Sequence, residues 1–494
     1  MNKTFLNRPR LHFTPAYGYM NDPNGLVYDR KKDVYHVCFQ YQKNPRCDLN
    51  VCWRHALGKD LCELEEKGTV IYPCDGGVAF SGCSVIDEKN CSRLFSEPGT
   101  NILSFFTVHN LETKHEYIAA AYSQDGRDWQ VLNRPVIENA NDEYGVNGFR
   151  DPKVIWTEQF NKWLMITGGG KARLFASENL LDWEYQSTVM NVPAADASII
   201  SELLVLQKYL PENDPYAKEL ITECPDLFPL STQTGNIKWI LSGGGLFYVV
   251  GDLKEDDGKI VFSPVSLRQT FMQCSDFFSH RGEPYALQTF ADGRTDRRLS
   301  FSWLMDDTAF EISEKPYNGV LSLPHELKLV KKEDTYVVCI YPIKELEKYR
   351  ETLLWEGMIE TGKVLSEKKV GLFEILLDFD CSKTDSFEIL CENEDNVLRF
   401  LFRTEEKRMY IDLTGADPYL KHKVHVMELN KCNVVRIIKD TSVLDIYVNE
   451  GARWYSVFTF HTDSNFYVSV RPTGSRMKIR NLEMYCLKSI YSTE

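Results

Sequence analysis

The apolar positions in the N-terminal part of the chain fall into short runs that alternate with polar positions and are separated by polar turns. A first pair of runs covers residues 26–28 and 34–41, with a polar turn at 29–33 between them. Alternation of this kind is typical of strands with one buried face, and two runs joined by a short turn indicate a β-hairpin. The same pattern starts again at four later places, namely 78–86, 154–156, 227–228 and 285–290.

The spacing of these hairpins and the later change of pattern predict two β-domains. Hairpins that recur roughly every 40 to 50 residues, with some longer insertions, are typical of propeller blades. Residues 343–351 are the one segment with a clear helical pattern. Strand-like segments of the sort found in a β-sandwich follow, at 371–379, 397–403, 434–437, 442–448, 456–460 and 466–471. We therefore predict an all-β protein, with a five-bladed β-propeller domain at 1–335, a linker with a short helix at 336–353, and a β-sandwich domain at 354–494.

Three of the hairpins begin with an acid next to a proline. These acids are Asp22 before Pro23, Asp151 before Pro152, and Glu223, which is separated from its proline by Cys224. Proline favours an extended conformation in the residue before it, so these acids are expected near strand starts. A single Asn-Asp-Pro-Asn-Gly stretch is also good turn chemistry in itself. Three equivalent acids, at the entrances of strands that line one propeller channel, instead favour one shared site.

Composition and charge exclude several classes of function. The 494 residues carry a net charge of −14, which argues against nucleic acid or an anionic membrane as the main partner. The sequence contains no run of about 18 apolar residues, the length that a membrane helix needs. Residues 1–10 lack the apolar core of a secretory signal. The 14 cysteines include no C-x-x-C pair, so no zinc ribbon is indicated. We expect a cytoplasmic protein with reduced thiols and without a cofactor or metal.

The motifs resemble those of glycoside hydrolase family 32, the β-fructofuranosidases, which include invertases, exo-inulinases and levanases. The blocks that carry the resemblance occur in the family's order, at 11–15, 20–25, 80–82, 149–154, 223–225, 285–290 and 321–324. The family has a five-bladed propeller followed by a β-sandwich, which agrees with the fold expected from the pattern. The sandwich part carries no motif of its own, so there the resemblance is one of position only.

The resemblance implies roles for the three acids. Asp22 would be the nucleophile, Glu223 the general acid/base, and Asp151 the stabiliser of the transition state. A retaining glycosidase needs this division, because one carboxylate attacks the anomeric carbon while a protonated carboxyl stands beside the leaving oxygen, about 5 to 5.5 Å away. The residues expected to line the fructose subsite are Asn21, Gln40, Trp53, Phe80, Ser81 and Arg150.

Some of these residues also have a purely structural interpretation. Trp53 and Phe80 are equally compatible with ordinary packing between blades. Cys224 could be a small buried residue, or it could tune the neighbouring Glu223.

The chain also departs from the family at the expected pocket rim. It has Tyr19 where the family usually has tryptophan, Arg54 where it commonly has glycine, and Gln42-Lys43 as an insertion. Because of these departures, the sequence does not decide which leaving group the protein prefers.

The expected activity is that of a retaining, exo-acting β-fructofuranosidase, which releases terminal non-reducing β-D-fructose from sucrose and short fructo-oligosaccharides. A fructosyltransferase and a sucrose 6-phosphate hydrolase are alternatives on the same fold, the latter with Arg54 as a conceivable phosphate ligand. An inactive carbohydrate-binding propeller is an alternative of another class. Free fructose from sucrose would exclude the inactive protein, and comparing glucose with fructose release separates hydrolysis from transfer. The sequence leaves the oligomeric state open.

Overall fold

The computed structural model describes residues 8–46, 49–73, 76–97, 99–189, 223–271, 281–291, 297–306, 316–333, 335–415, 424–459 and 464–491. Over these residues the chain is built from β-strands with short 3-10 helices, which confirms the all-β class. Among the helices of these residues, none has both the length and the apolar character needed to cross a membrane.

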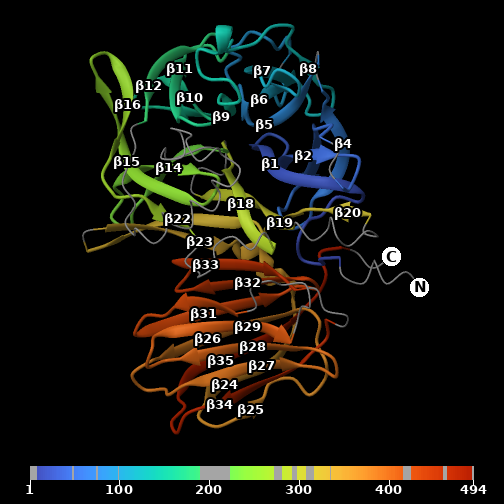
Figure 1. The fold of residues 1–494 in the computed structure, drawn as a ribbon, viewed down its shortest axis with the longest axis vertical. Coiled ribbons are helices and arrows are strands. Elements are labelled where there is room, and N and C mark those ends of the chain that lie inside the picture. Colours follow the sequence, from blue (N-terminus) through green and yellow to red (C-terminus); the bar gives the residue numbers. More distant parts are fainter. Residues whose placement is uncertain are drawn as a thin grey trace.

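The described residues before 343 form five sheets, antiparallel except for one short strand described below, and in each the main strands follow one another from the inner to the outer edge (Figure 1). The first sheet contains β1 (Gly18–Asp29), β2 (Val34–Gln42), β3 (Cys52–Gly58) and β4 (Glu65–Ile71). The second contains β5 (Gly77–Ile86), β6 (Ile102–Asn110), β7 (Glu116–Ser123) and β8 (Gln130–Val131). The third contains β9 (Arg150–Thr157), β10 (Lys162–Gly168), β11 (Arg173–Ser177) and β12 (Glu184–Thr188).

The fourth and fifth sheets are built in the same way. The fourth contains β13 (Asp226–Ser231), β14 (Ile237–Gly243), β15 (Phe247–Asp256), β16 (Lys259–Pro264) and β17 (Gln269–Thr270). The fifth contains β18 (Arg281–Thr289), β19 (Arg298–Asp306), β21 (Val320–Leu321), β22 (His325–Lys332) and β23 (Thr335–Pro342). Each predicted hairpin is therefore present as the first two strands of one sheet.

The inner strands of the five sheets form a closed cycle. Strands β1, β5, β9, β13 and β18 each contact the next, and β18 contacts β1 again. The chain closes this ring with β20 (Tyr317–Asn318), which lies between two strands of the fifth sheet in the sequence but pairs in parallel with β1 of the first sheet. The crossing needs Gly319 (φ +81°), because a Cβ atom there would lie 1.7 Å from the carbonyl oxygen of Met20. One short segment thus joins the first sheet to the last.

Two six-stranded sheets make up the C-terminal part of the described chain and pack face to face. One contains β24 (Arg350–Ile359), β35 (Ile479–Leu487), β26 (Phe373–Asp380), β31 (Cys432–Lys439), β32 (Val443–Val448) and β33 (Arg453–Phe458). The other contains β25 (Lys363–Val364), β34 (Tyr467–Pro472), β27 (Phe387–Glu392), β28 (Val397–Arg403), β29 (Arg408–Gly415) and β30 (Val424–Glu428). Their facing side chains form one apolar core, as expected of a sandwich.

The junction between the two parts is shorter than the predicted linker at 336–353. Its helix is a 3-10 helix over Lys344–Tyr349, in which Leu346 and Tyr349 are buried. Residues 335–342 instead form β23, the outer strand of the fifth sheet, and β24 begins at residue 350. The segment 335–342 (Thr-Tyr-Val-Val-Cys-Ile-Tyr-Pro) is rich in β-branched and aromatic residues, and this strand preference outweighs its closeness to the helix.

A buried ionic cluster ties the N-terminal segment to the sandwich. The ring of His12 lies 2.8 Å from Asp440 and 3.1 Å from Asp445, and all three side chains are fully buried. Burial alone would lower the pKa of His12, but the charges and hydrogen bonds of Asp445 and Asp440 raise it to about 9. The imidazole is therefore charged at neutral pH and holds the segment that leads into β1. In Figure 1, β32 and β33 of the sandwich face the five-sheet part at this junction.

Candidate active site

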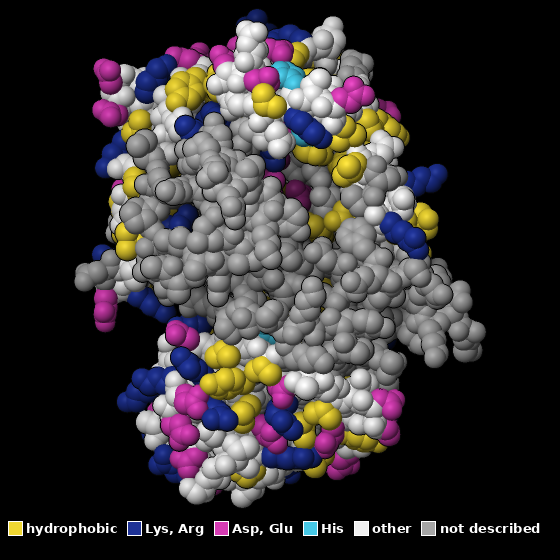
Figure 2. Space-filling model, in the orientation of Figure 1, with side chains coloured by type: hydrophobic (Ala, Val, Ile, Leu, Met, Phe, Trp, Pro, Cys, Tyr) yellow, Lys and Arg dark blue, Asp and Glu magenta, His cyan; other side chains and the backbone are white. Residues whose placement is uncertain are grey.

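Three acids from three different sheets meet at one end of the ring. Asp22 lies on β1, Asp151 is the second residue of β9, and Glu223 lies just before β13. Asp22 and Asp151 are buried, whereas the Glu223 side chain keeps 42% of its surface exposed. Each of the three charges acts on the others, as the pKa shifts below show. On the face in Figure 2, acidic and hydrophobic side chains lie within a hollow of the five-sheet part.

The inner strands are irregular at the level of the acids. The pairing of β1 with β2 shifts register between Met20 and Pro23 and again between Asn24 and Val27. Bulges of this kind re-aim side chains and are common beside active sites.

Two residues at the site also have positive φ angles, namely 59° for Asp151 and 43° for Cys224. Non-glycine residues rarely adopt these angles, so the surrounding contacts must hold them there.

Cys224 connects the two buried acids. Its backbone N–H donates to Oδ2 of Asp151 at 2.8 Å, and its thiol donates to Oδ2 of Asp22 at 3.2 Å. Burial and the neighbouring carboxylates raise the pKa of this thiol far above its usual value, so it stays protonated as a donor. Of the two interpretations of Cys224 made from the sequence, the one in which it tunes Glu223 named the wrong acid. The thiol instead hydrogen-bonds Asp22.

Asp22 is held by a line of polar side chains from the first and second sheets. Ser81 donates to its Oδ2 at 2.5 Å, Gln40 donates to Ser81 at 2.6 Å, and Asn21 donates to Gln40 at 2.5 Å. Burial raises the pKa of Asp22, the hydrogen bonds from Ser81 and Cys224 oppose that rise, and the result is about 6. The carboxylate of Asp22 is therefore mainly ionised at neutral pH although it is buried.

Asp151 has a stronger tendency to keep its proton. Burial raises its pKa to about 8, even though the Arg150 charge and the Cys224 N–H both favour the ionised form. The charges of Glu223 and Asp22 add to the rise. Its backbone N–H donates to Thr107 Oγ1 at 2.8 Å, which fixes the entrance of β9 against the second sheet.

Arg150 links the exposed acid to a buried one. Its Nη1 donates to Glu223 Oε1 at 3.0 Å, and its Nε donates to Glu116 Oε1 at 2.9 Å. Burial would raise the pKa of Glu116, but the hydrogen bond from His109 and the Arg150 charge keep it below its usual value. Glu116 is thus a permanent anion that orients the guanidinium toward Glu223.

An aromatic residue of the predicted subsite rests on this ionic group. Phe80 stacks on His109, with ring centroids 4.4 Å apart and planes at 14°. The same His109 contacts Glu116 through Nδ1 at 2.8 Å. On the other side of Glu223, the hydroxyl of Tyr285 donates to Oε2 at 2.6 Å. Both oxygens of Glu223 are therefore held from different sheets.

Trp53 is the predicted subsite residue that the structure does not bring to the acids. Its side chain is fully buried between the first and second sheets, where it meets Phe106 edge-on. Its indole N–H donates to the carbonyl oxygen of Phe80 at 3.0 Å. The packing interpretation therefore holds for Trp53, which supports Phe80 from behind. The other predicted residues all belong to the hydrogen-bonded or stacked network around the acids: Asn21, Gln40, Phe80, Ser81 and Arg150.

The residues that depart from the family are also held in place. Tyr19 is buried and meets Trp303 edge-on at 6.2 Å. Arg54 pairs with Glu66 at 2.7 Å and lies over the ring of Tyr41. With its charge matched in this way, Arg54 is a poorer phosphate ligand than the sequence suggested.

Gln42 is the third departure from the family, and it too is buried. It accepts the backbone N–H of Leu49 at 2.8 Å, so it closes the turn that the insertion creates.

The chain is similar to known proteins in sequence and in structure. Residues 12–342 match the N-terminal domain of the glycosyl hydrolases family 32. The chain is 30% identical over 418 residues to a fructan beta-fructosidase of Streptococcus mutans, covering 81% of this chain and 25% of that protein. It is 26% identical over 519 residues to a levanase of Bacillus subtilis, covering 98% of this chain and 71% of that protein.

A crystal structure of another protein has the same fold. The exo-inulinase of Aspergillus awamori superimposes with a TM-score of 0.81 at 20% identity, covering 98% of this chain and 99% of that one. The match to the family domain covers most of the five-sheet part, including all three acids and the network around them. The chain therefore belongs to glycosyl hydrolase family 32.

Proposed function

We propose that this protein is a retaining, exo-acting β-fructofuranosidase that hydrolyses sucrose and short fructo-oligosaccharides. The observation that carries the proposal is the contrast between two acids of one cluster. Asp22 is buried and stabilised as an anion by the neutral donors Ser81 and Cys224. Glu223 is partly exposed, and Arg150 and Tyr285 hold its two oxygens. Retaining glycosidases need one ionised carboxylate as the nucleophile and a second carboxyl group that donates and later accepts a proton.

In the first step, Asp22 attacks the anomeric carbon of the terminal fructose. The bond from that carbon to the leaving oxygen breaks, and Glu223 gives its proton to the oxygen, so the leaving sugar departs as a neutral alcohol. Arg150 and Tyr285 keep the carboxyl of Glu223 from rotating away while the proton moves. The product of this step is a fructosyl ester on Asp22.

In the second step, the carboxylate of Glu223 removes a proton from water, whose oxygen attacks the same carbon and releases fructose with retained configuration. Asp151 takes part through its charge. In the free enzyme the anionic Asp22 helps to keep Asp151 protonated. Formation of the ester removes the charge of Asp22, so Asp151 ionises more easily when positive charge develops on the sugar.

The ring of inner strands supports exo action. We infer that the five sheets are the blades of a five-bladed propeller, since their inner strands contact one another in a closed cycle. The acids lie at one end of this cycle and two of them are buried. A site of this depth accepts one terminal fructose, and remote sugars contribute to catalysis only where a subsite binds them.

The experiment that tests the proposal measures initial rates on a ladder of substrates. The ladder contains sucrose, sucrose 6-phosphate, and inulin- and levan-type oligomers of increasing length at equal concentration of chain ends. We expect free fructose from sucrose and from chain ends, with kcat/KM highest for di- and trisaccharides. Early products dominated by internal oligomers, or rates that rise with length, would contradict exo action. A preference for sucrose 6-phosphate would establish the phosphate-specific alternative.

A pH profile tests the assignment of Asp22 as the nucleophile. Because Asp22 must be ionised to attack, kcat/KM should fall as the pH drops through about 6. Ser81→Ala removes a hydrogen bond that favours the ionised form, so the acid limb should move to higher pH by roughly half to one unit. Ser84→Ala is the matched control, because Ser84 lies on the same strand and pairs with Ser104 instead. An acid limb that stays in place, or moves to lower pH, would refute the assignment.

We also propose a cytoplasmic location, which the state of the cysteines supports. The eleven cysteines of the described residues form no disulfide with one another. Proteins that fold in oxidising compartments usually pair such residues. We expect all or nearly all of the 14 thiols to react with a thiol reagent after denaturation without reductant. Several disulfides in freshly purified protein would contradict this location.

A further inference from the structure

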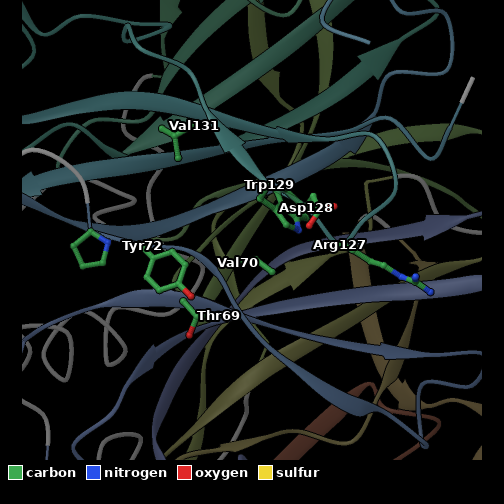
Figure 3. Close-up of a pocket in the computed structure, with 8 residues that line it drawn as sticks. Thr69, Val70, Tyr72, Arg127, Asp128, Trp129 and Val131 are labelled. Atoms are coloured by element: carbon green, nitrogen blue, oxygen red, sulfur yellow. The ribbon is translucent and has the colours of Figure 1, made fainter. Parts of the chain in front are cut away.

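A surface groove lies between the outer edges of the first and second sheets, away from the acids (Figure 3). Its volume is about 350 Å³, near the lower end of the range for small-ligand sites, roughly 300 to 1,000 Å³. One wall comes from β4 and the residues after it, and the other from β8 and the turn before it. The lining residues are Thr69, Val70, Tyr72, Pro73, Arg127, Asp128, Trp129 and Val131.

Part of this groove comes from a sequence repeat. Residues 123–129 and 177–183 share the pattern Ser-x4-Asp-Trp. In each copy the serine hydroxyl accepts a backbone N–H three residues later at 2.9 Å, from Gly126 in the first copy and Leu180 in the second. The two copies therefore form the same turn on neighbouring sheets, and the second copy serves as an internal reference for the first.

In the second copy, the aspartate and the tryptophan are used for structure. The indole N–H of Trp183 donates to the carbonyl oxygen of Leu180 at 3.0 Å, and its ring meets Phe105 edge-on. The carboxylate of Asp182 accepts a hydrogen bond from Asn179 at 2.8 Å. These contacts account for both side chains.

In the first copy, the same two side chains line the groove. Trp129 is half-buried against His55, and the rest of it forms part of the groove wall. The carboxylate of Asp128 has no hydrogen bond or ion pair with any residue of the described chain. Figure 3 shows Asp128 beside Trp129, while Arg127 extends away from the other lining residues. The first copy thus forms the same turn as the second, but its carboxylate and its aromatic ring are available to contact a ligand in the groove.

The opposite wall adds groups of matching chemistry. Tyr72 leaves 64% of its surface exposed, and the half-buried Thr69 contributes a hydroxyl. Aromatic faces pack against the C–H faces of sugar rings, while carboxylate and hydroxyl groups bind sugar hydroxyls. Arg127 and Asp128 balance each other in charge, so the groove favours a neutral ligand over a strongly charged one.

We propose that this groove is a non-catalytic binding site for a fructan chain, of which it holds one or two sugar rings. The choice of fructan rests on the proposed function, because this is the neutral polymer whose ends the acid cluster would process. Strands β4 and β8 are each the outermost strand of their sheets, whereas the acids belong to the inner edge of the ring. A chain held in the groove therefore leaves the acid cluster free and raises the local concentration of chain ends.

Affinity electrophoresis in gels that contain inulin or levan tests this proposal. All proteins carry Asp22→Asn, so that the polymer is not degraded, and the two polymers are used in separate gels to show which linkage binds. Adding Tyr72→Ala should weaken retardation roughly five-fold, the loss of one stacking contact. Adding Tyr185→Ala, which removes an exposed tyrosine from β12 of the third sheet, should leave it unchanged. A second pair compares Asp128→Asn with its repeat counterpart Asp182→Asn.

The outcomes separate this proposal from the proposed function. Equal retardation with and without Tyr72→Ala, or no retardation by either polymer, would overturn the groove as a fructan site. With Asp22 intact, Tyr72→Ala should release fructose from sucrose at the rate of the unsubstituted enzyme. Loss of that activity would mean that the groove is part of the catalytic site, which also contradicts the proposal. Absence of sucrose hydrolysis in the unsubstituted protein would instead refute the proposed function, and the gel experiment does not depend on it.

Discussion

Replacing Asp22 by asparagine should lower kcat on sucrose by roughly four to six orders of magnitude, the loss seen when a nucleophile is removed. Asparagine has the same size and keeps one oxygen to accept the Ser81 hydrogen bond. It cannot form the fructosyl ester, and no other described carboxylate accepts hydrogen bonds from both the Ser81 hydroxyl and the Cys224 thiol. The measurement is fructose release from sucrose, and near-normal turnover would refute the role of Asp22.

The same substitution should make the protein more stable above neutral pH. Burial raises the pKa of Asp22 from 3.8 to about 6 in the folded protein. A carboxyl whose pKa is higher in the folded than in the unfolded protein contributes stability that is fully present below its pKa in the unfolded protein. That contribution is lost as the pH rises through its pKa in the folded protein. Asp22→Asn avoids this loss of folding free energy, which is about 2 to 3 kcal/mol for a pKa shift of this size. Its free energy of unfolding should exceed that of the unsubstituted protein at pH 8 and match it below pH 4.

This result would also control for misfolding. A variant that is inactive and more stable at pH 8 has lost its chemistry and kept its fold. A variant that is inactive and less stable at every pH would say nothing about the nucleophile, and Ser81→Ala would then carry the test through its pH profile.

The sequence alone predicted the strands and the three acids because both depend on local signals. Alternation with period two marks strands wherever one face is buried, and the hairpins at 78–86 and 285–290 were recognised in this way. Proline beside Asp151 marked the entrance of β9, where Asp151 is the second residue. Asp22 was also expected at a strand start, but β1 begins earlier, at Gly18, so Asp22 lies inside the strand. The helix at 343–351 was placed correctly, but the strand just before it was taken for linker.

The contacts between sheets could not be predicted in the same way. Glu116 has no motif, and its role follows from its position opposite His109 across a strand pair and beside Arg150 from the next sheet. Trp53 was assigned to the subsite through the resemblance to the family, and the local sequence does not say which of two buried faces of a strand points toward the channel. The thiol of Cys224 reaches an acid 202 positions away in the sequence.

Tyr285 was within reach of sequence analysis. It lies at the start of the fifth predicted hairpin, and three of the other hairpins carry an acid at their entrances. It was overlooked because the search looked for carboxylates. In the structure, its hydroxyl holds the acid that the chemistry requires to be protonated.

Glu223→Gln should separate the two steps of the reaction. On sucrose, kcat should fall by roughly two to four orders of magnitude, because the leaving sugar no longer receives a proton. The amide keeps an oxygen for Arg150, and its NH₂ group can donate to the hydroxyl of Tyr285, so the surrounding contacts survive. An aryl β-D-fructofuranoside with a good leaving group needs no proton in the first step. On this substrate the variant should form the fructosyl ester at close to the unsubstituted rate.

The signature of this behaviour is a burst of the aryl alcohol, followed by a slow steady state. The burst arises because Asp22 still attacks, and the steady state is slow because glutamine cannot take a proton from water. Azide, which attacks without needing a base, should speed the second phase and give a fructosyl azide of retained configuration. Asp22→Asn should show no burst and no response to azide. If Glu223→Gln behaved like Asp22→Asn on the aryl substrate, Glu223 would be required for more than proton transfer, and its contact with Arg150 would be the first place to look.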